Sequence, residues 1–135
     1  MAKSTVKNDK ILLIDLAPDV DRWPESWKGD QKDLVYGNKL LPYFKQFLND
    51  LIAQGLSRTT LLRYIDDVGL LGRTIIKEVV LDQSHREKPL KKLLDSVADG
   101  GTLPDGIGSE DRMRSFERMC RRFESFLEKN QKLKG

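Results

Sequence analysis

The sequence predicts an all-α fold, a bundle of four principal helices preceded by an irregular N-terminal arm. Apolar residues recur at the i, i+3 and i+4 spacing of a helical face through most of the chain after residue 37. Gly, Ser and Pro residues fall between these stretches, where helices commonly end or begin. Hydrophobic residues make up 39% of the 135 residues and charged residues 33%, a composition that fits one well-solvated helical domain.

The first long helix is expected to follow a turn at residues 33–38, because Pro42 is tolerated in the first turn of a helix and not in its interior. Gly55 would end this helix, since glycine adopts the left-handed conformation without a Cβ penalty. The apolar face of the helix comprises Leu40, Leu41, Phe44, Phe47, Leu48, Leu51 and Ile52.

Ser57 is placed to cap a second long helix, which should run antiparallel to the first because only a few residues join the two. Gly69 and Gly72 each cost this helix about 1 kcal/mol relative to alanine. Gly72 lies in the middle of the apolar face, so we expect another helix to cross closely there. Leu70, on the opposite side, is either exposed or in contact with the arm. The apolar face comprises Leu61, Leu62, Ile65, Val68, Leu71, Ile75, Ile76 and Val79.

Two further helices complete the predicted bundle. Pro89 would occupy the first position of a short third helix, and Gly100 and Gly101 would end it. Ser109 is placed to cap the last helix, which runs to about Lys129. The residues expected to be buried are Leu90, Leu93, Leu94 and Val97 on the third helix and Met113, Phe116, Met119, Cys120, Phe123, Phe126 and Leu127 on the last.

The arm is expected to span residues 1–37 and the helical domain residues 38–135. Residues 1–9 are typical of a polar tail, and residues 11–16 are expected to form a strand-like strap on the helical core. Trp23 and Trp27 are interpreted as packing anchors rather than as a platform for nucleobases. Such a platform would need interleaved basic residues, whereas the residues around the tryptophans are acidic: Asp19, Asp21, Glu25 and Asp30.

No motif in the chain supports enzymatic chemistry. His85 has no cysteine or paired carboxylates at metal-ligand spacing, and no glycine-rich phosphate loop follows a strand. Cys120 is expected to be a buried, inert thiol, and a single cysteine indicates a reducing compartment. No apolar run approaches the roughly 18 residues of a membrane span. We therefore expect a cytoplasmic, non-enzymatic protein with no metal, cofactor, small-molecule substrate or membrane partner.

The positive charge belongs to the helical part of the chain. Residues 1–37 carry 6 Lys and Arg against 7 Asp and Glu, and the remainder carries 18 against 14, within a net charge of +3. This asymmetry points to an anionic partner. Three basic groups could contact it: Arg58, Thr59, Thr60 and Arg63 at the start of the second helix; Arg86, Lys88, Lys91 and Lys92 around the start of the third; and Arg114, Arg118, Arg121 and Arg122 along the last.

Each basic group admits two interpretations. A row of arginines on a helix can neutralise successive phosphates or reach base edges, and the first turn of a helix offers free amides to a phosphate. Alternatively, the first group is capping plus solvation, the second a solvated loop and the third a salt-bridged solvent face. Glutamates flank the arginine row of the last helix at helical spacing: Glu110, Glu117, Glu124 and Glu128.

Two segments resemble the SAM-like core-binding domain of tyrosine recombinases and phage integrases. They are residues 47–64, with Gly55-Leu56-Ser57-Arg58-Thr59-Thr60-Leu61 at their centre, and residues 114–127, which begin with Arg114-Ser115-Phe116. The order of elements matches that domain over roughly residues 38–130. The resemblance implies a SAM-like bundle that clamps DNA. The strand-cleaving residues of these enzymes belong to a separate C-terminal domain, so it implies no catalysis here.

The expected function is thus a non-catalytic DNA-binding module, related to a mobile element, that contacts duplex phosphates through basic helix faces. A partner protein would supply any catalysis. The alternative is a helical protein-interaction module, because SAM-like folds serve both roles and the net charge is small. DNA binding predicts a one-sided positive face, whereas an adaptor predicts an exposed apolar patch of several hundred Å².

Overall fold

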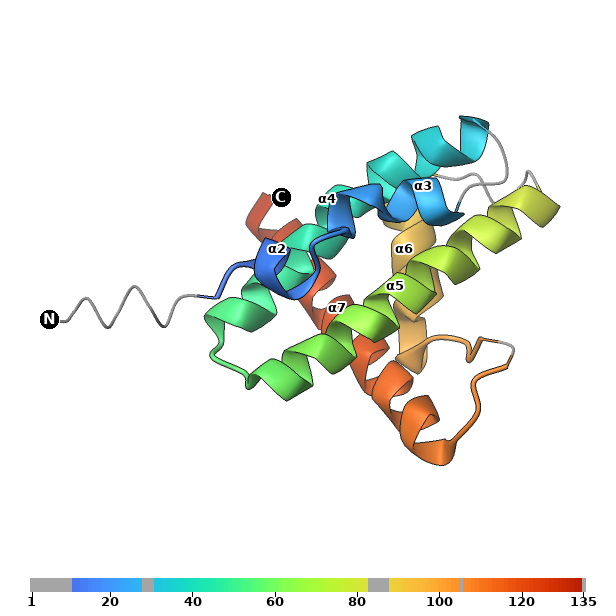
Figure 1. Ribbon diagram of the computed structural model, residues 1–135. Helices are drawn as coiled ribbons and strands as arrows, with labels where there is room; N and C mark the ends of the chain where they lie inside the picture. The colour runs from blue at the N-terminus through green and yellow to red at the C-terminus, as the bar shows by residue number, and fades with distance from the viewer. Residues whose placement is uncertain (1–10, 28–30, 83–87, 105, 135) are drawn as a thin grey trace, which may run out of the picture.

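Four helices form the bundle that the sequence predicts (Figure 1). The computed structural model describes residues 11–27, 31–82, 88–104 and 106–134, and the side chains up to residue 130; it contains no strand in these ranges. The bundle helices are α4 (Gln31–Ala53), α5 (Arg58–Leu81), α6 (Pro89–Val97) and α7 (Glu110–Lys134). The arm contains α2 (Leu13–Leu16), η1 (Val20–Arg22) and α3 (Trp23–Trp27), and η3 (Ala98–Gly100) follows α6.

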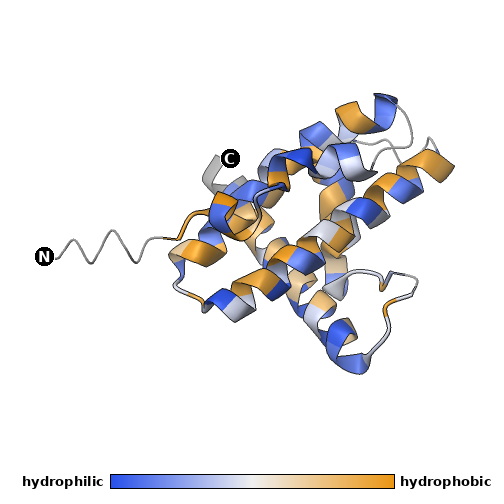
Figure 2. Cartoon of the chain, viewed as in Figure 1, coloured by the Kyte–Doolittle hydropathy of each residue, from blue (hydrophilic) through white to orange (hydrophobic). Residues whose placement is uncertain are grey.

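Helices α4 and α5 form a hairpin, and α7 crosses it and packs against both α5 and α6 (Figure 1). Apolar and polar residues alternate in patches along each long helix, as expected for amphipathic helices (Figure 2). Phe123 of α7 reaches the centre of the core, where its ring stacks on Phe47 at a centroid distance of 4.3 Å and meets Phe44 edge-on at 5.7 Å. The expected apolar faces are largely buried; Leu62 is an exception, with 37% of its surface exposed.

The expected start of the first long helix is wrong. Residues 33–38 are helical, and Pro42 lies inside α4 rather than in its first turn. The arm explains the extra turns, because Gly37 packs against Pro24, whose Cβ lies 3.0 Å from the position a Cβ on Gly37 would take. Pro42 and Asn38 are both exposed, so water can reach the Asn38 carbonyl, which has no amide partner at Pro42. The expected boundary between residues 37 and 38 therefore falls inside α4.

The strap at residues 11–16 is also not the strand-like segment we expected, since Leu13–Leu16 form the short helix α2. The Leu12 backbone N–H donates to the Asp15 carboxylate at 3.3 Å, a local bond that favours a helical turn. Leu13 and Leu16 are buried. The segment thus packs on the core, as predicted, in a different conformation.

The tryptophans are packing anchors, as the sequence predicts. Trp23 is 9% exposed, and the centroids of the Trp23 and Trp27 rings lie 6.0 Å apart. The Trp27 ring occupies the space beside Gly72, where an added Cβ would lie 2.3 Å from the ring and 2.9 Å from Phe44. The close approach expected at Gly72 is therefore confirmed, but the ring of an arm residue makes it together with α4. Leu70 is partly buried and lines a cleft shared with the arm.

The predicted starts of the second, third and last helices are confirmed. Ser57 Oγ accepts a hydrogen bond from the Thr60 amide at 3.2 Å, and Ser109 Oγ accepts one from the Arg112 amide at 3.1 Å. Pro89 is the first residue of α6. Helix α7 continues to Lys134, beyond the expected end at Lys129. None of the helices in the described part of the chain has the length and apolar character needed to cross a membrane.

Candidate nucleic-acid interface

Two hollows lie along helix α7, one between α7 and α4 and the other between α7 and α5. The larger, which we call the α4/α7 hollow, has a volume of about 960 Å³. The smaller, the α5/α7 hollow, has a volume of about 330 Å³. The α4/α7 hollow is lined by Phe47, Asp50, Leu51, Gln54, Arg114, Glu117, Arg118, Arg121, Arg122, Ser125, Phe126, Lys129 and Asn130. The α5/α7 hollow is lined by Leu56, Thr59, Thr60, Arg63, Tyr64, Ser115, Arg118 and Arg122.

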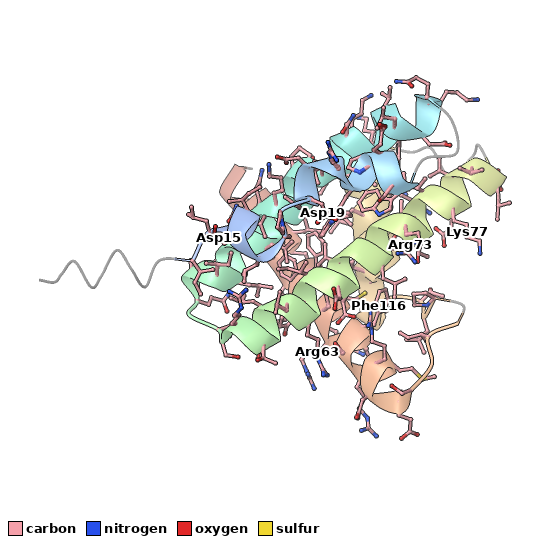
Figure 3. All side chains as sticks on the ribbon, in the orientation of Figure 1. Asp15, Asp19, Arg63, Arg73, Lys77 and Phe116 are labelled. Atoms are coloured by element: carbon pink, nitrogen blue, oxygen red, sulfur yellow. The ribbon has the colours of Figure 1, made fainter. Side chains whose placement is uncertain are left out.

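Arg118 and Arg122 line both hollows. Two of the basic groups picked out from the sequence, at the start of α5 and along α7, therefore meet at one concave face. Arg63 projects from the first half of α5 beside α7 (Figure 3). We call this face the basic surface. Its residues are Thr59, Thr60, Arg63, Arg114, Arg118, Arg121 and Arg122. Arg58, the first residue of α5, is exposed beside it and lines neither hollow.

Two arginines of the α7 row form the intrahelical ion pairs that the solvated-face interpretation expects. Arg114 lies 3.6 Å from Glu110 and 3.9 Å from Asp111, and Arg121 lies 3.0 Å from Glu117. All of these side chains are at least half exposed, so each pair contributes only tenths of a kcal/mol, about 0.3–0.5 for this helical spacing. Such pairs can open readily when a phosphate approaches.

The other two arginines of the row have different surroundings. No described carboxylate forms an ion pair with Arg118 or Arg122. The Arg122 guanidinium lies over the ring of Tyr64 on α5, 5.7 Å from its centroid. This cation–π contact holds the Arg122 side chain against α5. Two cations with no acidic partner among the described residues thus lie where the hollows meet.

The start of α5 has fewer free backbone N–H groups than the sequence suggests. The Thr60 amide, one of the free amides expected there, already donates to the Ser57 hydroxyl, which in turn donates to Thr60 Oγ1 at 3.0 Å. The Thr60 amide is therefore occupied and would have to break this bond to bind an anion.

The third basic group lies apart from the basic surface. Arg86 falls outside the described residues, and Lys88 is exposed at the start of α6. Lys91 pairs with Asp95 at 3.0 Å, and the buried Lys92 pairs with Glu78 at 2.6 Å. At 1.5 Å per residue, Glu78 lies about 27 Å beyond Thr60 along α5. The structure thus joins two of the three basic groups and leaves Lys88, Lys91 and Lys92 near the far end of α5.

Sequence reasoning missed a buried polar cluster beneath the basic surface. Asp67 of α5 is fully buried and receives a hydrogen bond from the Ser115 hydroxyl of α7. Its other carboxylate oxygen, Oδ1, lies 3.0 Å from Arg112 Nε, also on α7. The signal was present, because Asp67 falls between Tyr64 and Leu71 on the apolar face of its helix. An acid at a core position indicates partners on the facing helix.

Burial shifts the acid–base behaviour of two side chains in this region. The pKa of Asp67 is raised because burial disfavours its charged form, although Ser115 and Arg112 act in the opposite direction. Burial, together with the carboxylates of Asp67, Glu117 and Glu124, raises the pKa of the Cys120 thiol to about 12. Cys120 is therefore the buried and unreactive thiol that the sequence predicts.

The chemistry available at the basic surface is anion binding. Three guanidiniums and two threonine hydroxyls border the α5/α7 hollow, and every one of them can donate hydrogen bonds. Phe47 is 1% and Tyr64 6% exposed, so neither offers a face for stacking a base, and Phe126 in the larger hollow is only partly exposed. Within the described residues, no three His, Cys, Asp or Glu side chains are grouped so that they could hold a metal ion.

Comparisons with known proteins add no relative. The chain matches no protein-family model, no curated protein and no solved structure.

Proposed function

We propose that this protein is a non-catalytic DNA-binding module that contacts duplex phosphates through its basic surface. The observation that carries the proposal is the position of Arg118 and Arg122, which line both hollows and pair with no described carboxylate. The resemblance to the core-binding domain of tyrosine recombinases supports the same function. In such a module, catalysis would come from a partner protein, and the protein would act in the cytoplasm.

The surroundings of the arginines favour duplex over single-stranded DNA. Proteins that bind single strands stack bases on exposed aromatic rings, whereas Phe47 and Tyr64 are buried and Phe126 is only partly exposed. A surface that presents guanidiniums and hydroxyls is suited to phosphates instead. Binding is then mainly electrostatic and little dependent on sequence.

The test is a titration of labelled duplex with the protein at rising salt concentrations, read by fluorescence anisotropy. Contact with about four to six phosphates gives a log–log slope of roughly −4 to −5. The matching single strand serves as the comparison and should bind more weakly. A slope close to zero, or no complex with duplex at low salt, would rule out the proposed function.

A helical protein-interaction module is the second candidate. It is favoured by the exposed apolar residues at the end of α5, where Val80 is 43% and Leu81 77% exposed. Exposed apolar side chains mark interfaces when they gather into a patch. Absence of duplex binding at low salt would shift the assignment to this candidate.

A further inference from the structure

The lining of the α5/α7 hollow distinguishes it from the rest of the basic surface. Arg63 approaches from α5, and Arg118 and Arg122 approach from α7. Among the described residues, no Asp or Glu lines this hollow, whereas Asp50 and Glu117 line the larger one. Three cations around a hollow of about 330 Å³ favour a compact ligand with negative charge.

We propose that the α5/α7 hollow is a specific binding site for a single phosphate group, supplied by the DNA backbone. This inference rests on the proposed function for the source of the phosphate. A phosphate presents several charged acceptor oxygens, and the hollow presents groups that can donate to them: guanidiniums and the hydroxyls of Thr59 and Thr60. The site gives the protein one fixed contact, around which the other arginines make weaker electrostatic ones.

One of the donors is held in place before any ligand arrives. Arg122 lies against the Tyr64 ring, which is itself buried. Ser115 borders the hollow, and its hydroxyl donates to Asp67 behind it, so this bond ties α7 to α5 across the site. The packing of the two helices that carry the arginines is therefore fixed by the core. A preorganised site loses less entropy when it binds its ligand.

Other ligands fit the hollow less well. A base would need an exposed ring to stack on, and Tyr64 is buried. The α4/α7 hollow differs in having an apolar floor of Phe47, Leu51 and Phe126 as well as two acids. The smaller hollow is thus the part of the surface suited to one anion rather than to an extended partner.

The direct test is titration with inorganic phosphate, followed by two-dimensional NMR of the amides at constant ionic strength set with sodium chloride. The backbone amides of Thr59, Thr60 and Ser115 should shift and reach saturation. Arg122→Lys keeps the charge and loses the planar fork, and it should weaken phosphate binding about tenfold, as expected for one lost charge-assisted hydrogen bond. Duplex DNA added to the phosphate-bound protein should displace the phosphate.

Arg114→Gln is the matched control. Arg114 belongs to the same arginine row but lines only the larger hollow, so its loss should change phosphate affinity less than twofold, about 0.4 kcal/mol at most. Melting temperatures of both variants establish that the fold is intact.

The possible outcomes separate this inference from the proposed function. Saturable phosphate binding that Arg122→Lys weakens, and that duplex DNA displaces, supports both. Duplex binding with no saturable response to phosphate, and with equal effects of Arg122→Lys and Arg114→Gln, overturns the phosphate site and leaves DNA binding standing. Saturable phosphate binding without duplex binding overturns DNA as the source and, with it, the proposed function.

Discussion

Asp67 Oδ1 on α5 lies 3.0 Å from Arg112 Nε on α7. The two atoms form an ion pair but are not aligned for a hydrogen bond. The Ser115 hydroxyl binds the other carboxylate oxygen. One fully buried acid thus connects two residues of α7 to the middle of α5. Because Arg118 and Arg122 follow on the same helix, this connection also sets how the arginine row faces the start of α5.

The raised pKa of Asp67 makes stability depend on pH. A carboxyl whose pKa is raised by folding contributes stability that is fully present below its unfolded value, about 3.9, and is lost as the pH rises through the folded value. Asp67→Asn removes this titration. Relative to that variant, the parent should therefore gain free energy of unfolding as the pH falls from 8 towards 4.

Urea unfolding of both proteins across this pH range gives the comparison, and taking the difference cancels the titration of the other carboxylates. A difference that stays constant would contradict the raised pKa of Asp67, and one that grows with rising pH would show that Arg112 stabilises its charged form.

Two glycines three residues apart on α5 should respond oppositely to alanine. At Gly72 an added Cβ would meet the Trp27 ring at 2.3–2.4 Å and Phe44 at 2.9 Å, so Gly72→Ala forces the arm to move and should destabilise the fold by about 1–3 kcal/mol. At Gly69 the nearest atom, on Trp23, is 3.8 Å away. Gly69→Ala should then gain about 0.5–1 kcal/mol from helix propensity. Denaturant midpoints measure both, and a neutral or stabilising effect of Gly72→Ala would contradict the packing of Trp27 on Gly72.

Ser57 should contribute to stability as the cap of α5. Its Oγ accepts the Thr60 amide at 3.2 Å, so Ser57→Ala should cost about 0.5–2 kcal/mol of unfolding free energy. Ser125→Ala is the control: Ser125 is exposed inside α7, and alanine there should be neutral or slightly stabilising. Equal midpoints for Ser57→Ala and the parent would remove the cap.

The parts of the fold that the sequence predicts well are those that depend on local chemistry. Periodicity, Ser57, Pro89 and Ser109 locate the four helices because each acts on residues within one turn. The start of α4 could not be found this way. Pro42 argues against helical structure in the residues that precede it. This local rule is overridden by a contact between the arm and α4, in which Pro24 packs on Gly37. The same limit applies to α2, whose short apolar run fits a strand or a helix equally well.

The candidate site shows the same division between local and long-range information. The arginine row of α7 follows from helical spacing alone, but its meeting with Arg63 depends on how α7 crosses the hairpin. No spacing rule gives that crossing from one sequence. Asp67 could have indicated part of this crossing, because a buried acid restricts which polar residues of α7 can face α5. Arg112 and Ser115, one helical turn apart, were the partners to look for.

Arg118 and Arg122 should bind DNA through localised phosphate contacts rather than through a diffuse positive field. Arg118→Glu combined with Arg122→Glu removes two cations from the junction of the hollows and adds two anions. If both arginines contact phosphates, the log–log salt slope should become shallower by about 2. Duplex affinity should fall on the order of 100-fold, counting about 1.4 kcal/mol for each contact. The fold should lose only about 1 kcal/mol, mostly from the cation–π contact with Tyr64.

The charge-matched control is Arg73→Glu combined with Lys77→Glu. Both residues are exposed on the second half of α5 (Figure 3) and lie outside the two hollows. Along the helix they are about 20–26 Å from Thr60, well beyond the screening length of about 8 Å at physiological salt. The control should therefore keep the salt slope of the parent and most of its affinity. Equal losses in the two double variants would mean that DNA responds to total charge, and that the meeting of α5 and α7 forms no specific interface.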